Sequence, residues 1–213
     1  MKIFATIDIR KFENEKLLNE ALANASDFRK KKYEAMNNHQ GKLQVIANTY
    51  LLNKCLNELN LNEKDMDYAI EKNGKLKFTN APDIHFNLSH SKNMSLAVLS
   101  DKQVGCDIQF IDKVDEKLYD LVLSEEERKY VVGAKLASPQ SVGDDILSSR
   151  VRASLTSPVE KFYELWAMKE AIIKKDGTGL RDRLIDVHDD NVYIEKRFLK
   201  NNGIVEEYIL AII

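Results

Sequence analysis

The spacing of apolar residues changes at Asn73-Gly74, and this change limits most strongly what the chain can fold into. Before it, apolar residues between Leu43 and Leu59 recur three and four positions apart, which predicts a helix buried along one face. After it, short apolar segments separated by turn residues predict strands, which we assign to one sheet, at 75–78, 84–88, 95–99 and 104–110. We therefore expect the mixed α/β (α+β) class.

The N-terminal segment adds a strand and a charged helical region. Lys2–Ile9 is rich in β-branched and aromatic residues, which predicts a strand at the start of the chain. Charged residues dominate between Glu13 and Tyr33, and they include the basic run Arg29-Lys30-Lys31-Lys32. Such a run on a helix is usually a solvated face.

The C-terminal part predicts a long helix followed by a hairpin. Ser157 can cap the helix, Pro158 suits its first turn and Glu160 can complete a capping box. The helix should end near Lys175, because Gly177 can adopt the left-handed conformation of a C-terminal cap. A closing hairpin is predicted by two segments on either side of Asn201-Asn202-Gly203, at 192–198 and 207–213.

Two stretches indicate how the chain is divided. Residues 133–157 carry Ser, Gly, Asp and Pro with little periodicity, so we expect a loop that is either functional or mobile. The strands of the predicted sheet end near 111–115. We place the boundary there, between an N-terminal α/β half, 1–112, and a C-terminal α/β half, 113–213.

Length, charge and composition exclude several classes of protein. The 213 residues leave room for one large domain or two small halves packed together. With 32 basic and 34 acidic residues the net charge is −2, so we expect no nucleic-acid partner. Two cysteines, no signal peptide and no apolar run of about 18 residues predict a cytoplasmic protein without membrane contact. The sequence also lacks a Walker A loop, an HExxH motif, a GxSxG motif and a paired CxxC.

Polar residues follow an apolar strand at Asn87-Leu88-Ser89-His90-Ser91. A strand end brings side chains to a surface or cleft, where adjacent Ser89 and His90 could donate hydrogen bonds to a phosphate. A hydrogen-bonded turn explains the same residues, because Asn, Ser and His are common in turns. A Ser–His hydrolase pair fits less well, because neighbours on an extended chain point to opposite faces.

Asp107 lies inside an otherwise apolar predicted strand, and the two-residue period places Gln109 on the same side. A buried carboxylate has to be paired, hydrogen-bonded or bound to a cation. Oxygen ligands suit Mg²⁺, whereas a neighbouring lysine or arginine would give Asp107 a structural role. Both interpretations stay open on these residues alone.

Glu170 and Lys174 are four positions apart in the predicted C-terminal helix and are therefore neighbours on one face. Phe162, Trp166 and Ile173 flank them. An intrahelical ion pair worth about 0.3–0.5 kcal/mol would suit a surface helix but does not explain these aromatic surroundings. A carboxylate for a metal ion and a lysine for a phosphate fit better.

Taken together, these segments resemble the 4′-phosphopantetheinyl transferases of the long, surfactin-synthetase-activating type, over nearly the whole chain. An FNxSHS segment, a GxD strand and a WxxKExxxK helix in this order form a specific combination, although each is weak alone. The matching residues are Gly74-Lys75, Phe86 to Ser91, Val104 to Ile108, Phe162 to Lys174, Gly177 to Leu180 and Tyr208 to Ala211.

The resemblance implies a pseudo-dimer of two similar α/β halves, with coenzyme A and Mg²⁺ bound in the cleft between them. It implies that Asp107 and Glu170, one from each half, bind Mg²⁺, and that Gln109 stands where the family often has a further acid. It also implies a set of residues that bind coenzyme A: Ser89 and His90 at the 3′-phosphate, and Lys75, Lys174 and Lys31 at phosphates.

The reaction that the resemblance implies is phosphoryl transfer. A serine hydroxyl of an apo acyl or peptidyl carrier protein attacks the β-phosphate of coenzyme A, and adenosine 3′,5′-bisphosphate leaves. Lys174 would offset charge on the transferred group, and Glu170 is the candidate base. Such carrier proteins serve fatty acid, polyketide or nonribosomal peptide biosynthesis, and two fused halves predict a monomer.

The chain departs from the family pattern in three places. Gln109 replaces an acid, Leu76 stands where a proline commonly follows Gly-Lys, and the stretch 133–157 is longer than the usual link. Gln109 motivates one alternative, a coenzyme-A-binding protein that has lost transferase activity. A second alternative is an α/β structural or interaction module in which these polar groups satisfy one another.

Overall fold

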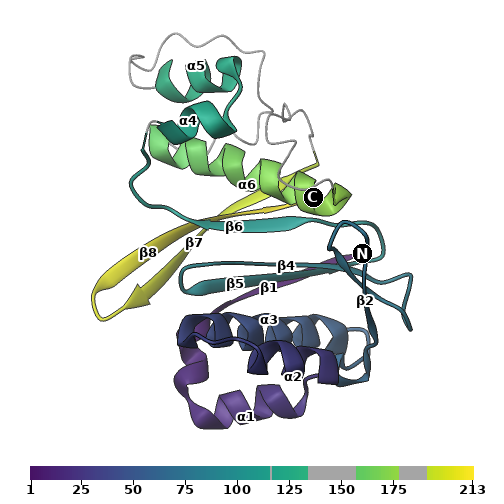
Figure 1. Ribbon diagram of the computed structural model, residues 1–213. Helices are drawn as coiled ribbons and strands as arrows, with labels where there is room; N and C mark the ends of the chain where they lie inside the picture. The colour runs from purple at the N-terminus through teal and green to yellow at the C-terminus, as the bar shows by residue number, and fades with distance from the viewer. Residues whose placement is uncertain (116, 134–156, 178–190) are drawn as a thin grey trace.

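The computed structural model describes residues 1–115, 117–133, 157–177 and 191–213, and within them the chain forms two three-stranded antiparallel sheets and a two-stranded one (Figure 1). In the first sheet the central strand is β5 (Met94–Ser100), between β1 (Lys2–Asp8) and β4 (His85–Ser91). In the second the central strand is β8 (Ile204–Ile212), between β6 (Cys106–Phe110) and β7 (Tyr193–Asn201). The two-stranded sheet pairs β2 (Tyr68–Ile70) with β3 (Leu76–Phe78). The mixed α/β class is confirmed.

The prediction that the strands between residues 75 and 110 form one sheet is wrong. β3 pairs with β2, β5 pairs with both β4 and β1, and β6 pairs with β8. The apolar pattern finds strands from local residues, but β5 and β6 pair with strands from distant parts of the chain, β1 and β8. β6 lies before the expected boundary between residues 112 and 113, yet by sheet membership it groups with the C-terminal strands.

Each three-stranded sheet is covered on one face by a long helix (Figure 1). α3 (His39–Asn57) covers the first sheet and α6 (Pro158–Asp176) covers the second. The remaining helices lie outside these two: α1 (Glu15–Ala23), α2 (Asp27–Glu34), α4 (Lys117–Val122) and α5 (Glu125–Gly133), with short 3-10 helices η1 (Ile9–Glu13) and η2 (Glu63–Asp65). In Figure 1 the order of layers is helices, sheet, sheet, helices.

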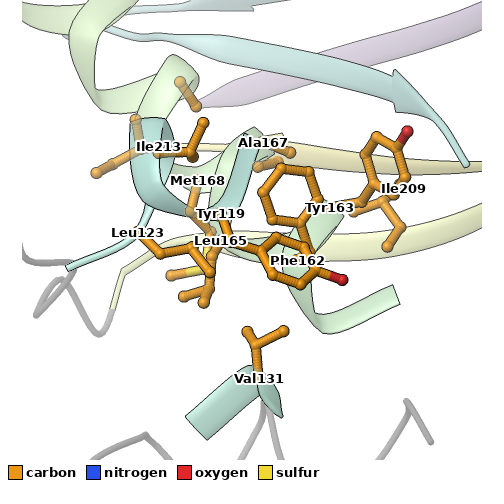
Figure 2. Packing of buried hydrophobic residues seen from close by; sticks show 13 residues of the cluster. Tyr119, Leu123, Val131, Phe162, Tyr163, Leu165, Ala167, Met168, Ile209 and Ile213 are labelled. Carbon is orange, nitrogen blue, oxygen red and sulfur yellow. The ribbon is translucent and has the colours of Figure 1, made fainter. Parts of the chain in front are cut away.

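The core around α6 explains why that helix is fixed in place. Figure 2 shows Phe162, Leu165 and Met168 of α6 packed with Tyr119 of α4 and Val131 of α5. All of these side chains are buried. Because the helix is anchored along its length, the polar side chains on its other face have fixed positions.

The ends of α6 form as the sequence predicts. Ser157 and Glu160 make the capping box, and Gly177 caps the C-terminus with φ +68°. A Cβ on Gly177 would lie 2.0 Å from Nδ2 of Asn73, and one on Gly105 would lie 1.9 Å from the carbonyl oxygen of Ala171. Glycine at these two positions therefore allows α6 to approach both β6 and the β2–β3 turn.

The two large sheets meet where β4 runs beside β6, and side chains join them. The backbone N–H groups of β6 donate to alternate side chains of β4: Cys106 to Asn87 Oδ1 at 3.1 Å, Ile108 to Ser89 Oγ at 3.4 Å and Phe110 to Ser91 Oγ at 2.9 Å. These side chains satisfy the outward N–H groups of an edge strand, which would otherwise lack partners. We call these three contacts the β4–β6 seam.

The structure contains three further elements that the sequence predicts. The strand at the start of the chain, the helix from Leu43 and the closing hairpin are confirmed as β1, α3 and β7–β8. The predicted loop falls mainly on 134–156, which lies outside the described residues, as does Thr178 to Leu180 of the family match. Among the described helices, none combines the length and apolar character that a membrane span requires.

Candidate functional site

A cavity of about 400 Å³ is lined by residues from α2, α3, the β2–β3 turn, β4 and α6. Its charged side chains are mostly cationic. Among the described residues that line it, Glu170 supplies the acid, and the basic side chains are Arg29, Lys32, Lys75, His90 and Lys174. A cavity with this lining favours an anionic ligand that carries more than one charge.

Arg29 is the most buried of these cations, with 2% of its surface exposed. Its guanidinium lies over the ring of Tyr68, 5.3 Å from the centroid, and its Nε is 3.9 Å from Oε1 of Glu63. Nε and Nη2 have no hydrogen-bond partner in the described part of the chain. Buried N–H groups without an acceptor are costly, so this guanidinium indicates a place for an anionic ligand.

The basic run divides between solvent and cavity. Lys31 and Lys32 are both exposed on α2, but only Lys32 lines the cavity. Desolvation by the surrounding protein lowers the pKa of Lys32, and the charge of Arg29 lowers it further. Arg29 and Lys32 are three positions apart and share a helix face. The helical period therefore pairs them, but it does not show whether this face turns toward the cavity or toward solvent.

Ser89 and His90 are both in β4, so the alternative in which they form a turn is wrong; the chain turns after them, at Lys92-Asn93. Ser89 is buried beside β6, and His90 lines the cavity. The protein around the imidazole lowers the pKa of His90, and the charges of Lys174 and Lys32 lower it further. In the ligand-free protein His90 is therefore neutral at pH 7.

Asp107 is 2% exposed and is held by three side chains. Its carboxylate accepts hydrogen bonds from Ser89 Oγ at 2.7 Å and Gln109 Nε2 at 2.6 Å, and it forms an ion pair with Lys174. Gln109 and Asp107 lie on the same side of β6, as the two-residue period predicts. In this structure a lysine neutralises the buried carboxylate, which was one of the two open interpretations.

Lys174 connects α6 with this cluster. Its Nζ lies 3.0 Å from Ser89 Oγ in addition to its contact with Asp107. Burial acts to lower the pKa of Lys174, but the charge and hydrogen bond of Asp107, together with the contribution of Cys106, outweigh it, so the pKa is raised and the ammonium stays protonated. Glu170, one turn earlier and also on the cavity, adds to this stabilisation of the charged form.

Lys169, next to Glu170, points to a different part of the protein. Its side chain is 2% exposed, and Nζ donates to Glu127 Oε2 at 2.6 Å and to the carbonyl of Val122 at 2.8 Å. It therefore anchors α6 to the segment of α4 and α5. Glu170, by contrast, lines the cavity.

Lys75 lines the cavity from the β2–β3 turn, but its ammonium is already hydrogen-bonded. Nζ donates to the carbonyls of Lys175 at 2.7 Å and Val104 at 3.3 Å, and to Gln103 Oε1 at 3.0 Å. Burial lowers its pKa. In the ligand-free protein Lys75 therefore holds the β2–β3 turn against the end of α6.

The oxygen donors near Lys174 suit a hard cation such as Mg²⁺. Asp107 and Glu170 offer carboxylates and Gln109 an amide oxygen, but the described residues hold no group of three or more His, Cys, Asp or Glu that could bind a metal by themselves. The ammonium of Lys174 is already placed on the Asp107 carboxylate, where a cation is favourable. Mg²⁺ sites in which substrate phosphates complete the coordination typically have only one or two protein carboxylates as ligands. Asp107, Glu170 and Gln109 therefore fit Mg²⁺ that is held together with a phosphate ligand.

Three polar residues that line the cavity, Arg29, Lys32 and Asn48, are not among the site residues predicted from the sequence. The sequence pattern places Arg29 and Lys32 on a solvated helix face. Asn48 lies in the apolar helix α3, is 7% exposed, and its Oδ1 has no hydrogen-bond partner among the described residues. An amide on the buried stripe of an amphipathic helix is a signal that the sequence does contain.

Comparison with known proteins finds similarity to one family. Residues 103–204 match the model of the 4′-phosphopantetheinyl transferase superfamily, and this region contains Asp107, Gln109, Glu170 and Lys174. The 4′-phosphopantetheinyl transferase psf-1 of Bacillus pumilus is 32% identical over 117 residues, which cover 53% of this chain and 40% of the relative. The transferase ffp of Bacillus subtilis is 29% identical over 136 residues, covering 64% and 48%.

A third relative, the 4′-phosphopantetheinyl transferase gsp of Aneurinibacillus migulanus, is 33% identical over 98 residues, covering 46% of this chain and 33% of the relative. The chain thus spans about a third to a half of the length of these curated relatives. The family match and the relatives agree with the resemblance seen in the sequence motifs. This chain is similar to the 4′-phosphopantetheinyl transferase superfamily over residues 103–204, and to three Bacillus and Aneurinibacillus transferases over 46% to 64% of its length.

Proposed function

We propose that this protein transfers the 4′-phosphopantetheine group of coenzyme A to a serine hydroxyl of an apo acyl or peptidyl carrier protein, in a Mg²⁺-dependent reaction. The observation that carries the proposal is the cavity lined by Arg29, Lys32, His90 and Lys174, with Glu170 beside them. Coenzyme A bears a diphosphate and a 3′-phosphate, so it needs cations at both ends of such a cavity. The match of residues 103–204 to the 4′-phosphopantetheinyl transferase superfamily supports the same reaction.

The phosphates would be held from two directions. Arg29 and Lys32 approach from α2, and Lys174 approaches from α6, with His90 between them on β4. Lys75 would contribute once its ammonium turns from the carbonyls that it now contacts. Lys31 is exposed and could reach a phosphate only outside the cavity, so we assign its proposed contact to Lys32.

Asp107, Glu170 and Gln109 would hold Mg²⁺, which when bound offsets negative charge on the diphosphate. Lys174 bonds to Asp107 in the ligand-free protein, so it has to release that carboxylate. The released ammonium remains beside the cavity and can then interact with the phosphoryl group. Ser89 keeps Asp107 oriented through its 2.7 Å hydrogen bond.

The bond changes are those of a single phosphoryl transfer. The serine oxygen of the carrier protein forms a bond to the β-phosphorus. The bond from this phosphorus to the bridging oxygen breaks, and adenosine 3′,5′-bisphosphate leaves with the electron pair. Glu170 is our candidate to accept the serine proton, and Lys174 offsets the charge on the transferred phosphoryl group.

We further propose that the chain is a pseudo-dimer of two halves and acts as a monomer in the cytoplasm, where coenzyme A and apo carrier proteins are available. The equal arrangement of the two large sheets supports the two halves: in each, the first strand is at an edge and the last strand is central. Pairing of β6 with β8 favours a division between β5 and β6.

The test is intact-mass analysis of an apo acyl and an apo peptidyl carrier protein, each incubated with this protein, coenzyme A and Mg²⁺. We expect a gain of about 340 Da, the phosphopantetheine mass that phosphoryl transfer would add. The control carrier protein has its acceptor serine changed to alanine. Coenzyme A binding without a mass gain on either carrier would contradict the transfer and support the binding-only alternative.

A further inference from the structure

Glu63 is a fully buried carboxylate, 0% exposed, that the proposed reaction does not use. It lies in η2 and does not line the cavity. Its Oε2 accepts a hydrogen bond from the backbone N–H of Ser26 at 2.6 Å, and its Oε1 accepts from Ser26 Oγ at 2.8 Å and from the Tyr68 hydroxyl. Burying a carboxylate away from solvent costs free energy unless the group is paired and hydrogen-bonded, so the contacts of Glu63 need an explanation.

The two residues that hydrogen-bond to the Glu63 carboxylate, Ser26 and Tyr68, also contact Arg29. Ser26 is the N-cap of α2, and its Oγ accepts the backbone N–H of Arg29 at 3.3 Å. Tyr68 provides the ring beneath the guanidinium, and that ring also stacks on Phe28 with centroids 4.8 Å apart. Glu63 thus sets the start of the helix and the aromatic surface on which Arg29 rests.

The charge of Glu63 holds Arg29 without occupying its donors. The 3.9 Å between Nε and Oε1 is too long for a hydrogen bond, although the two charges attract each other. Arg29 Nε and Nη2 therefore keep no hydrogen-bond partner among the described residues. The guanidinium is held in position while its N–H groups remain available to a ligand.

We infer that Glu63 is a positioning residue that presents Arg29 to a phosphate group of the bound substrate. This inference rests on the proposed function for the identity of the ligand, coenzyme A. In this role Arg29 contacts the ligand from the cavity wall, and Glu63, which does not line the cavity, holds Arg29 in position.

The direction in which Glu63→Gln changes the affinity for coenzyme A distinguishes a positioning role from a purely electrostatic one. Replacing Glu63 by Gln removes a negative charge near the cavity, which by electrostatics alone would tighten the binding of an anion. If Glu63 positions Arg29, the same change weakens binding. We expect Glu63→Gln to raise the Kd and the KM for coenzyme A about tenfold, with kcat within about twofold of wild type.

A double-mutant cycle tests whether Glu63 acts through Arg29. In an Arg29→Gln background we expect Glu63→Gln to cause no further loss of coenzyme A affinity, because the group that it positions is gone. Affinity is measured by calorimetry with coenzyme A, and the folded fraction is matched by circular dichroism. Equal losses in both backgrounds, or an unchanged or tighter Kd in the single variant, would overturn the positioning role.

Glu206 provides a matched control. It is also buried, at 6% exposure, it accepts a hydrogen bond from the Tyr208 hydroxyl at 3.1 Å, and it lies 3.3 Å from Arg10. It does not line the cavity. We expect Glu206→Gln to leave coenzyme A affinity within about twofold of wild type, and a loss equal to that of Glu63→Gln would overturn the inference.

Tyr68→Phe keeps the inference testable if Glu63→Gln does not fold. It removes one hydrogen bond to Glu63 and leaves the ring under Arg29 in place. We expect the Kd for coenzyme A to rise about threefold, and no change would count against the inference. The proposed function fails separately, if the wild-type protein itself neither binds coenzyme A nor modifies a carrier protein.

Discussion

The two ends of the cavity hold a cation in opposite ways. At the α2 end, Arg29 is 3.9 Å from the nearest oxygen of Glu63 and keeps free N–H donors among the described residues. At the α6 end, Lys174 is bonded directly to Asp107 and to Ser89. The first cation is ready for a ligand, whereas the second is already neutralised.

From this difference we expect the α2 end to determine substrate binding and the α6 end to determine the rate of the chemical step. A preorganised cation lowers the cost of binding, because it does not have to give up another hydrogen-bond partner when the phosphate arrives. A cation paired with a buried carboxylate has to exchange partners, and the incoming diphosphate is the group that can drive the exchange. We therefore expect changes at the α2 end to alter KM and changes at the α6 end to alter kcat.

Glu170→Gln should give the largest effect and tests the α6 end. The variant keeps the size of the side chain but removes the charge that we assign to the metal and to the serine proton. We expect kcat to fall about 10³-fold, with KM for coenzyme A within about threefold of wild type. Carrier-protein modification followed by mass spectrometry gives both values.

Glu164→Gln is the control for that variant on the same helix. Glu164 is 2% exposed, and burial, with a further contribution from Glu160, raises its pKa to about 8, so it is largely neutral at pH 7. Its replacement by a neutral amide should leave kcat unchanged. If Glu170→Gln also left kcat unchanged, the contrast between the two ends of the cavity would be lost.

Gln109→Glu should have a smaller effect and sharpens the same contrast. The amide of Gln109 donates to Asp107 at 2.6 Å, and a carboxylate there would repel Asp107 instead. We expect the variant to lose about 1 kcal/mol of unfolding free energy without Mg²⁺ and to recover more than wild type when Mg²⁺ is added. Thermal unfolding with and without Mg²⁺ measures this. An identical response to Mg²⁺ in both proteins would separate Gln109 from the metal.

The smallest expected effect is the pH dependence of binding through His90, which lies between the two ends. The pKa of the free imidazole is lowered, and a bound phosphate would raise it, so binding takes up a proton. Affinity for coenzyme A should therefore rise about threefold as the pH falls from about 7.5 to 6. Calorimetry across this range gives the slope.

Two controls show whether the pH dependence of coenzyme A affinity arises from His90. His90→Gln should flatten it, because the titrating group is absent. Dephospho-coenzyme A, which lacks the 3′-phosphate, should show a weaker slope with the wild-type protein. Equal slopes for both ligands would place His90 away from the 3′-phosphate.

The sequence predicted those features that depend on residues close together in the chain. The capping residues of α6, the left-handed Gly177 and the shared side of Asp107 and Gln109 all follow from local geometry, and each is confirmed. The partner of Asp107 could not be decided, because Lys174 lies 67 positions away and either a lysine or a metal would satisfy the carboxylate.

The α2 end of the cavity shows a second feature that could not be predicted from the sequence. Arg29 and Lys31 both belong to a run of basic residues, and composition alone does not say which of them turns inward. The choice is made by Glu63, 34 positions from Arg29, and by the ring of Tyr68. A long-range contact of this kind leaves no periodic signal in the sequence.

The β4–β6 seam ties the alignment of the two sheets to the chemistry of the site. Because Asn87, Ser89 and Ser91 occupy alternate positions, a slip of β6 by two residues would still offer hydroxyl or amide acceptors to most of its N–H groups. It would, however, move Asp107 away from Ser89 and Lys174 by roughly 6–7 Å, the rise of two strand residues. The contact between Asp107 and Ser89 therefore forms only when β6 lies in its native register beside β4.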